Sequence, residues 1–102
     1  MRYLGAMSGS GMVKCDGEEI ARASYEFEGY FRKPAGVTSS GEIRIPAEAL
    51  QNVFGRAGVQ LVTDEGRVLE LRFSEKKQPK PEEDVAHVEV TGDLPDETQW
   101  SR

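Results

Sequence analysis

The chain has 102 residues, of which 37% are hydrophobic and 30% charged, and its formal net charge is −5. This length suits one domain, and the composition is too polar for a membrane-embedded protein but apolar enough for a small core. The single Cys excludes an intramolecular disulfide, and together with the single His it excludes the usual Cys/His zinc cages. No apolar targeting segment is visible near the start, so we expect a cytoplasmic protein with no membrane partner.

The negative charge is concentrated towards the C-terminus. Residues 82–102 hold seven Asp and Glu against one Arg, whereas the preceding residues are nearly neutral. A nucleic-acid-binding protein normally presents a clustered basic face, so we do not expect a nucleic-acid partner. We predict one β-rich domain over residues 1–95 and a flexible acidic tail over 96–102 that either solubilises the chain or docks on a basic partner.

Alternation of apolar and polar residues predicts two strands in the first third of the chain. A short strand over 12–15 follows a flexible lead over 8–11, and an Asp16-Gly17 turn joins it to a long strand over 20–32. One face of the long strand is expected to be buried. The residues expected on its outward face are Arg22, Ser24, Glu26, Glu28, Tyr30 and Arg32.

A further strand over 42–45 precedes the only helix that the sequence predicts, over about 46–55. Pro46 suits the first turn of a helix, because its φ is fixed and it lacks an N–H. The helix then shows one apolar stripe, and Gly55 can take the left-handed conformation that ends helices. The residues of the stripe are Ala49, Leu50, Val53 and Phe54.

The rest of the chain predicts three more strands, over 59–63, 67–73 and 85–91, with a polar loop over 74–84. All connections suit antiparallel pairing. The expected fold is therefore mainly β, a small antiparallel barrel or sandwich of about six strands with one short helix.

The residues available for catalysis are few. A Ser-His-Asp or Cys-His site would have to use His87, which is expected on the polar face of its strand near Glu89. Cys15 is expected on an inward face, where a thiol acts as a small hydrophobe. No Gly-x-Ser-x-Gly elbow and no phosphate-binding loop is present. We therefore expect a protein that is not an enzyme and has no catalytic residues, no cofactor and no metal. An enzyme that uses His87 is kept as the last of three hypotheses.

The outward face of the long strand and the single Trp hold the candidate interaction residues. Tyr30 beside Arg32 combines an aromatic ring with a cation, although the same face could simply carry cross-strand ion pairs. Trp100 either forms a docking motif or packs back onto the domain. We expect a small non-catalytic module that binds another protein or a small ligand. Its expected interaction surface consists of Arg22, Glu26, Tyr30, Arg32 and Trp100.

A second hypothesis rests on a resemblance over residues 40–73. The segment Ser40-Gly41-Glu42-Ile43-Arg44-Ile45-Pro46 precedes a short helix that ends at Phe54-Gly55, and a hairpin around 64–66 follows. This arrangement resembles the swapped-hairpin DNA-binding domains of AbrB-type regulators and addiction antitoxins. The resemblance implies an intertwined homodimer that presents Arg44, and more loosely Arg56, to DNA. The acidic C-terminal segment would then suit an antitoxin that grips its toxin.

Overall fold

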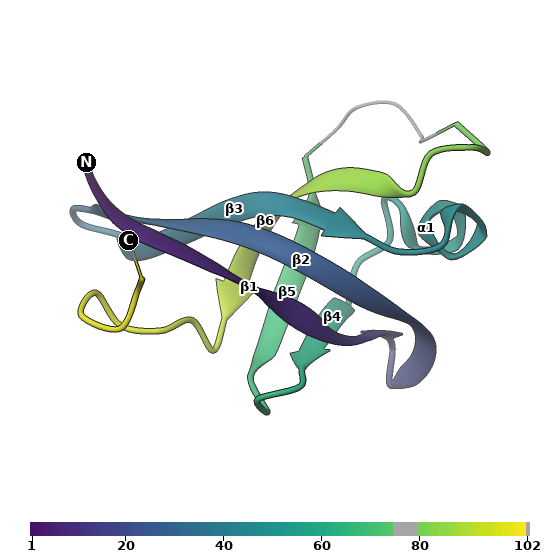
Figure 1. Cartoon of the computed structure of the whole chain (residues 1–102), viewed down its shortest axis with the longest axis horizontal. Coiled ribbons are helices and arrows are strands. Elements are labelled where there is room, and N and C mark those ends of the chain that lie inside the picture. Colours follow the sequence, from purple (N-terminus) through teal and green to yellow (C-terminus); the bar gives the residue numbers. More distant parts are fainter. Residues whose placement is uncertain (75–79, 102) are drawn as a thin grey trace.

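The computed structural model describes residues 1–74 and 80–101, which form six strands and one helix. In chain order these are β1 (Arg2–Cys15), β2 (Glu18–Arg32), β3 (Gly36–Arg44), α1 (Ala47–Val53), β4 (Val59–Thr63), β5 (Val68–Phe73) and β6 (Val85–Gly92). The strands pair antiparallel in the order β1-β2-β3-β6-β5-β4, and β4 pairs back onto β1 to close a barrel (Figure 1). The mainly β fold with one short helix is confirmed, and the sheet is a closed barrel rather than a sandwich.

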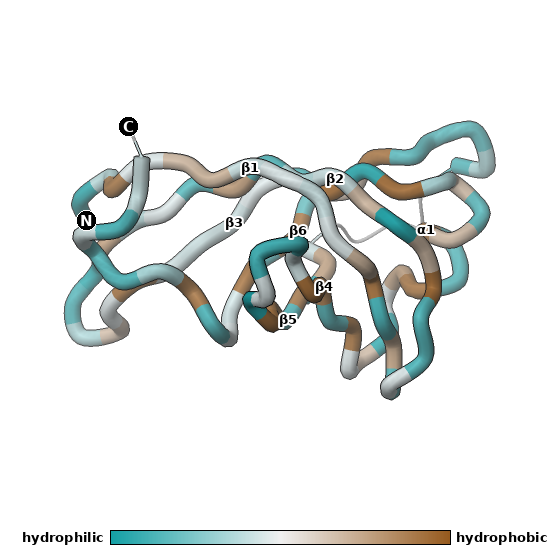
Figure 2. Tube along the Cα trace, turned by 60° about the horizontal axis from the view of Figure 1, so that its bottom comes forward, coloured by the Kyte–Doolittle hydropathy of each residue, from teal (hydrophilic) through white to brown (hydrophobic). Residues whose placement is uncertain are grey.

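The alternation predicted for β2 is confirmed by the burial of its side chains. Ala23, Tyr25 and Phe27 are buried and their neighbours are exposed. In the other strands, too, every second side chain points into the barrel and fills its core. The largest side chains with almost no exposure are Phe27, Ile43, Leu50, Leu61 and Leu69. In Figure 2 the long strands β1 and β3 contain pale stretches, where Gly, Ser and Thr replace strongly apolar residues.

β1, β2 and β3 are longer than the barrel requires. β4 pairs only with residues 11–15 of β1, and β6 pairs only with residues 39–44 of β3. A three-stranded extension therefore projects from the barrel (Figure 1). It consists of residues 2–10 of β1, the end of β2 that pairs with them, and residues 36–38 of β3. The predicted flexible lead over 8–11 is wrong, because these residues pair with β2 through the backbone, which needs no apolar side chains.

Two glycines allow the strands to approach closely as the barrel closes. A Cβ at Gly11 would collide with the carbonyl oxygen of Val62 in β4, and one at Gly41 would collide with the carbonyl oxygen of Glu26 in β2. Neither glycine has a positive φ. Their role is therefore space, since a side chain at either position would push neighbouring backbone apart at the points where the sheet curls.

The helix α1 is shorter than the predicted range of 46–55. Pro46 and Phe54 flank it with extended backbone angles, and Gly55 takes the predicted left-handed conformation with φ of 78°. Leu50 and Val53 are fully buried in the barrel core, so the predicted apolar stripe faces inward. With seven residues, the one helix in the described ranges is too short to cross a bilayer.

The segment after Pro95 was expected to be a flexible acidic tail, but it folds back onto the extension. Trp100 is 8% exposed, and its Nε1 donates a hydrogen bond to the carbonyl oxygen of Pro95 at 3.2 Å. The N–H of Ala6 donates to the carbonyl oxygen of Ser101 at 2.6 Å. Burial of the indole favours this arrangement over a free tail. Arg102 and residues 75–79 of the predicted polar loop lie outside the described residues.

Candidate functional site

The structure separates the five residues that the sequence nominates for interaction. Arg22, Glu26, Tyr30 and Arg32 lie on the outward face of β2, as alternation requires. Trp100 instead lies against Gly29, which precedes Tyr30 in β2 and belongs to the opposite, buried face of the strand. Tyr30 and Arg32 share one groove, whereas the other three residues do not line it.

Arg22 is engaged in a structural ion pair. Its guanidinium donates to both carboxylate oxygens of Asp64, at 2.8 and 2.9 Å. The hydrogen bonds from Arg22 hold the pKa of Asp64 below its ordinary value, and the same contact raises the pKa of Arg22. The pair ties β2 to the turn between β4 and β5, so Arg22 is not available as a free cation for a partner.

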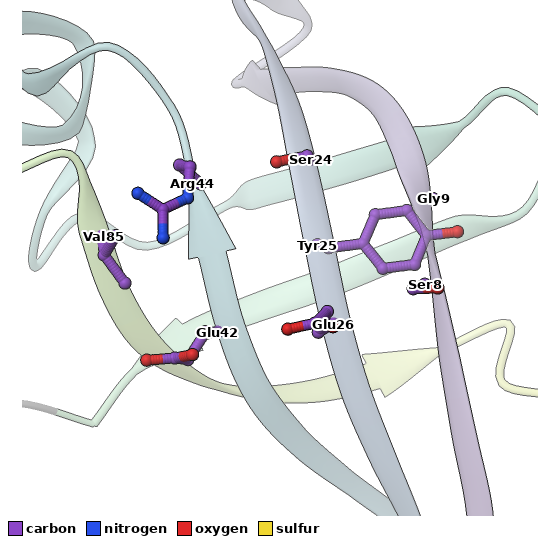
Figure 3. A pocket seen from close by; sticks show the side chains of 8 residues that line it. All are labelled: Ser8, Gly9, Ser24, Tyr25, Glu26, Glu42, Arg44 and Val85. Atoms are coloured by element: carbon purple, nitrogen blue, oxygen red, sulfur yellow. The ribbon is translucent and has the colours of Figure 1, made fainter. Parts of the chain in front are cut away.

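Glu26 lies in a shallow depression of about 340 Å³ on the outer face of the sheet (Figure 3). Glu26 and Glu42 stand directly opposite each other on β2 and β3, and Arg44, which also lines the depression, pairs with Asp84 at 3.2 Å. Like charges at facing positions repel. Among residues 1–74 and 80–101 no three Asp, Glu, His or Cys converge as metal ligands.

A larger groove of about 500 Å³ lies where β6 separates from β3. We call it the Tyr30–Arg32 groove. It is lined by Met1, Tyr30, Arg32, Val37, Thr38, Ser39, Ser40, Glu89, Val90 and Thr91. The groove is at the extension, because Ser39–Val90 is the last pair of the β3–β6 ladder on that side.

Aromatic and apolar side chains are exposed around this groove. The rings of Tyr3 and Tyr30 pack at a centroid distance of 5.5 Å, and Tyr3 remains 42% exposed. Met1 is 80% exposed. The Tyr30 hydroxyl donates to Glu28 Oε2 at 3.3 Å. Partial desolvation, followed by the charge of Glu28, raises the pKa of Tyr30, so the phenol stays protonated and can donate a hydrogen bond.

Arg32, like Arg67 and Arg72, forms no ion pair with a carboxylate of the described residues. Its Nη2 lies 3.3 Å from Met1 Sδ, and a thioether is a weak acceptor. No carboxylate in the described ranges pairs with Arg32, whereas four other arginines form ion pairs. Those pairs are Arg2–Glu97, Arg22–Asp64, Arg44–Asp84 and Arg56–Asp16.

Ser39 contributes a buried hydroxyl to the same groove. The residue is 6% exposed, and its Oγ has no hydrogen-bond partner within the described part of the chain. An unsatisfied buried hydroxyl costs free energy, so a polar atom that reached it would be bound favourably. The groove therefore combines a free cation, a hydroxyl without a partner and exposed aromatic surface.

The residues of the two alternative hypotheses lie elsewhere. Arg44 and Arg56 each face an aspartate, and one chain closes the barrel without a second copy. His87 is exposed, and its Nδ1 lies 2.7 Å from Ser74 Oγ. Cys15 is 2% exposed in the core, as predicted.

Comparison with known proteins gives no relative: no protein-family model matches the chain, and no curated protein or solved structure matches it. Functional inference therefore depends on the geometry of the chain itself. The strand predicted over 42–45 begins at Gly36 in the structure, so the contribution of residues 37–40 to the groove was missed. The β-branched pair Val37-Thr38 is the signal that could have extended the strand.

Proposed function

We propose that this protein is a non-catalytic interaction module that binds a partner protein through the Tyr30–Arg32 groove. The observation that carries the proposal is the position of the unneutralised Arg32 beside exposed Met1 and the tyrosine pair. Tyr and Arg are enriched among the residues that dominate binding energy at protein interfaces. Their placement on paired strands, rather than on a loop, supports a preformed binding surface.

The contact between a serine hydroxyl and an imidazole, Ser74 Oγ with His87 Nδ1 at 2.7 Å, lies outside the groove, which supports a role of the groove in binding rather than catalysis. Ser39 has no hydrogen-bonded base in the described residues, although hydrolases of the Ser-His type need one. The groove is not lined by His87. The swapped-hairpin hypothesis is not carried further, because nothing in the closed single-chain barrel favours it.

The test is selection of peptides from a display library of random twelve-residue sequences. The variants Tyr30→Ala and Arg32→Glu change the groove. Lys80→Glu makes the same change of charge at an exposed position that does not line it. We expect the wild type and Lys80→Glu to select the same peptides, and both groove variants to bind them about tenfold more weakly or worse. Failure of the wild type to select any peptide, or equal binding by all four proteins, would contradict the proposal.

A further inference from the structure

The groove continues the free edge of β3. A ligand that binds along such an edge has to be extended. Building on the proposed function, we infer that its partner is an extended peptide with an acidic residue. This peptide adds as a strand to the free edge of β3 at residues 36–38, with the acidic residue next to Arg32.

The free edge arises because β6 changes its partner. β3 pairs with β2 along its whole length, from Gly36 to Arg44, but β6 pairs only with residues 39–44. Beyond Val90, β6 continues on β5 through Thr91 and Gly92. No described strand pairs with residues 36–38 on the side away from β2. Backbone N–H and C=O groups that point to this side have no strand partner, which is the condition for strand addition.

The side chains around this edge suit an added strand. Val37 and Thr38 both line the groove, and successive residues of a strand face opposite sides of the sheet. An added peptide would thus place alternate side chains beside Tyr30 and Thr38, which are directly paired on β2 and β3. Its other side chains would face towards Val37 and Ser39. The Ser39 hydroxyl could then gain the partner that the described residues do not provide.

Arg32 favours an acidic residue in the peptide. It pairs with Gly36, which has no side chain, and a Cβ built there would meet nothing within 4 Å. No side chain of β3 at this position therefore separates the guanidinium from the free edge. A carboxylate would be the charged partner that Arg32 lacks among the described residues.

Glu89 sets the other end of the groove. It pairs with Ser40, four residues along β3 from Gly36, which corresponds to about 13 Å of strand. An added strand can pair with β3 only over residues 36–38, because β6 already pairs with residues 39 and 40, so Glu89 lies just beyond the last paired position. Repulsion by Glu89 disfavours a second acidic residue at that end, so the charge preference also defines the direction of the peptide.

The experiment uses a panel of seven-residue peptides of Val and Thr that carry Asp, Asn or Lys at one scanned position. Binding is measured by fluorescence anisotropy with the full chain. In the preferred position we expect Asp to bind about tenfold more tightly than Lys. Arg32→Glu should reverse this order, and Lys80→Glu should leave it unchanged. N-methylation of alternate peptide bonds should weaken binding in one register and not in the other, since only one set of N–H groups faces β3.

The outcomes separate this inference from the proposed function. Binding that depends on Tyr30 and Arg32 but ignores both N-methylation and peptide charge overturns strand addition and leaves the interaction module intact. The same holds if no panel peptide binds while the random library yields groove-dependent peptides without an acidic residue. If neither the panel nor the library yields a peptide that depends on the groove, the proposed function fails as well.

Discussion

The indole of Trp100 lies flat against Gly29 of β2. A Cβ at Gly29 would be 2.5 Å from Cε2 of Trp100, and less than 3 Å from two other ring atoms. Because Gly29 has no side chain, the indole can lie directly on the backbone of the sheet, where it is 8% exposed. Ser101 continues from it to the backbone of Ala6. The contact between these two residues thus fixes the C-terminal segment across the extension.

Replacement of Gly29 by Ala should displace the indole. The methyl group would occupy the space of the ring, and overpacking of this kind costs about 1–3 kcal/mol. We expect a shift of the tryptophan emission to longer wavelength and a lower urea midpoint. Trp100 is the only Trp, so the emission reports on this site alone. Glu28→Ala, on the opposite face, is the control, and unchanged emission and stability in Gly29→Ala would contradict the packing described.

Replacement of Gly41 by Ala should destabilise the barrel more severely. The new Cβ would meet the carbonyl oxygen of Glu26 and lie 2.8 Å from the Cα of Phe27, and both atoms belong to backbone. Backbone in a paired strand cannot rotate away as a side chain can, so we expect a loss of about 3 kcal/mol in denaturant unfolding. Ser40→Ala is the neighbouring control. Equal stability of the two variants would show that β3 and β2 have room at this point.

The Arg22–Asp64 pair should contribute stability only above acidic pH. The pKa of Asp64 is held below its ordinary value of 3.8 chiefly by hydrogen bonds from Arg22. The folded protein therefore binds this proton less readily than the unfolded chain, and the contribution is lost as pH falls through the lowered value. We expect the wild type to be slightly more stable than Asp64→Asn at neutral pH and equally stable at strongly acidic pH. The measurement is thermal unfolding of both proteins over this range of pH. A stability difference between them that does not change with pH would argue against an ionic contribution.

Cys15 should react with a thiol reagent only after unfolding. The residue is 2% exposed and belongs to the barrel core. Because it is the only Cys, labelling with Ellman's reagent measures its accessibility directly. We expect labelling of the native protein to be slow and to accelerate through the urea transition. Fast labelling under native conditions would mean that the end of the barrel near Cys15 opens readily.

The protein should be a monomer in dilute solution. One chain pairs β4 with β1 and so completes the barrel, which therefore needs no strand from a second copy. Size-exclusion chromatography with light scattering should give a mass near 11.3 kDa. A dimer that persists on dilution would instead favour the intertwined architecture of the swapped-hairpin domains.

Much of the fold follows from side-chain patterns that are local in the sequence. Alternation through β2 predicts that Ala23, Tyr25 and Phe27 are buried, and Pro46 with Gly55 brackets α1. The hairpin around residues 64–66 is equally visible, because turn residues separate two alternating segments. For the candidate site, the same alternation places Tyr30 and Arg32 on one face. These features depend on residues close together in the chain, so the sequence by itself determined them.

The remaining features were decided by tertiary structure. Residues 8–11 form a strand because β2 supplies the partners for their backbone groups. Backbone pairing does not require a pattern of apolar and polar side chains, so the sequence does not reveal it. Trp100 packs on Gly29, which is distant from it in the sequence. The residues around Gly29 do not reveal that this glycine leaves room for the indole. The groove exists because β6 leaves β3 at Val90 to pair with β5. The length of a ladder depends on how the barrel closes, and closure is a property of all six strands together.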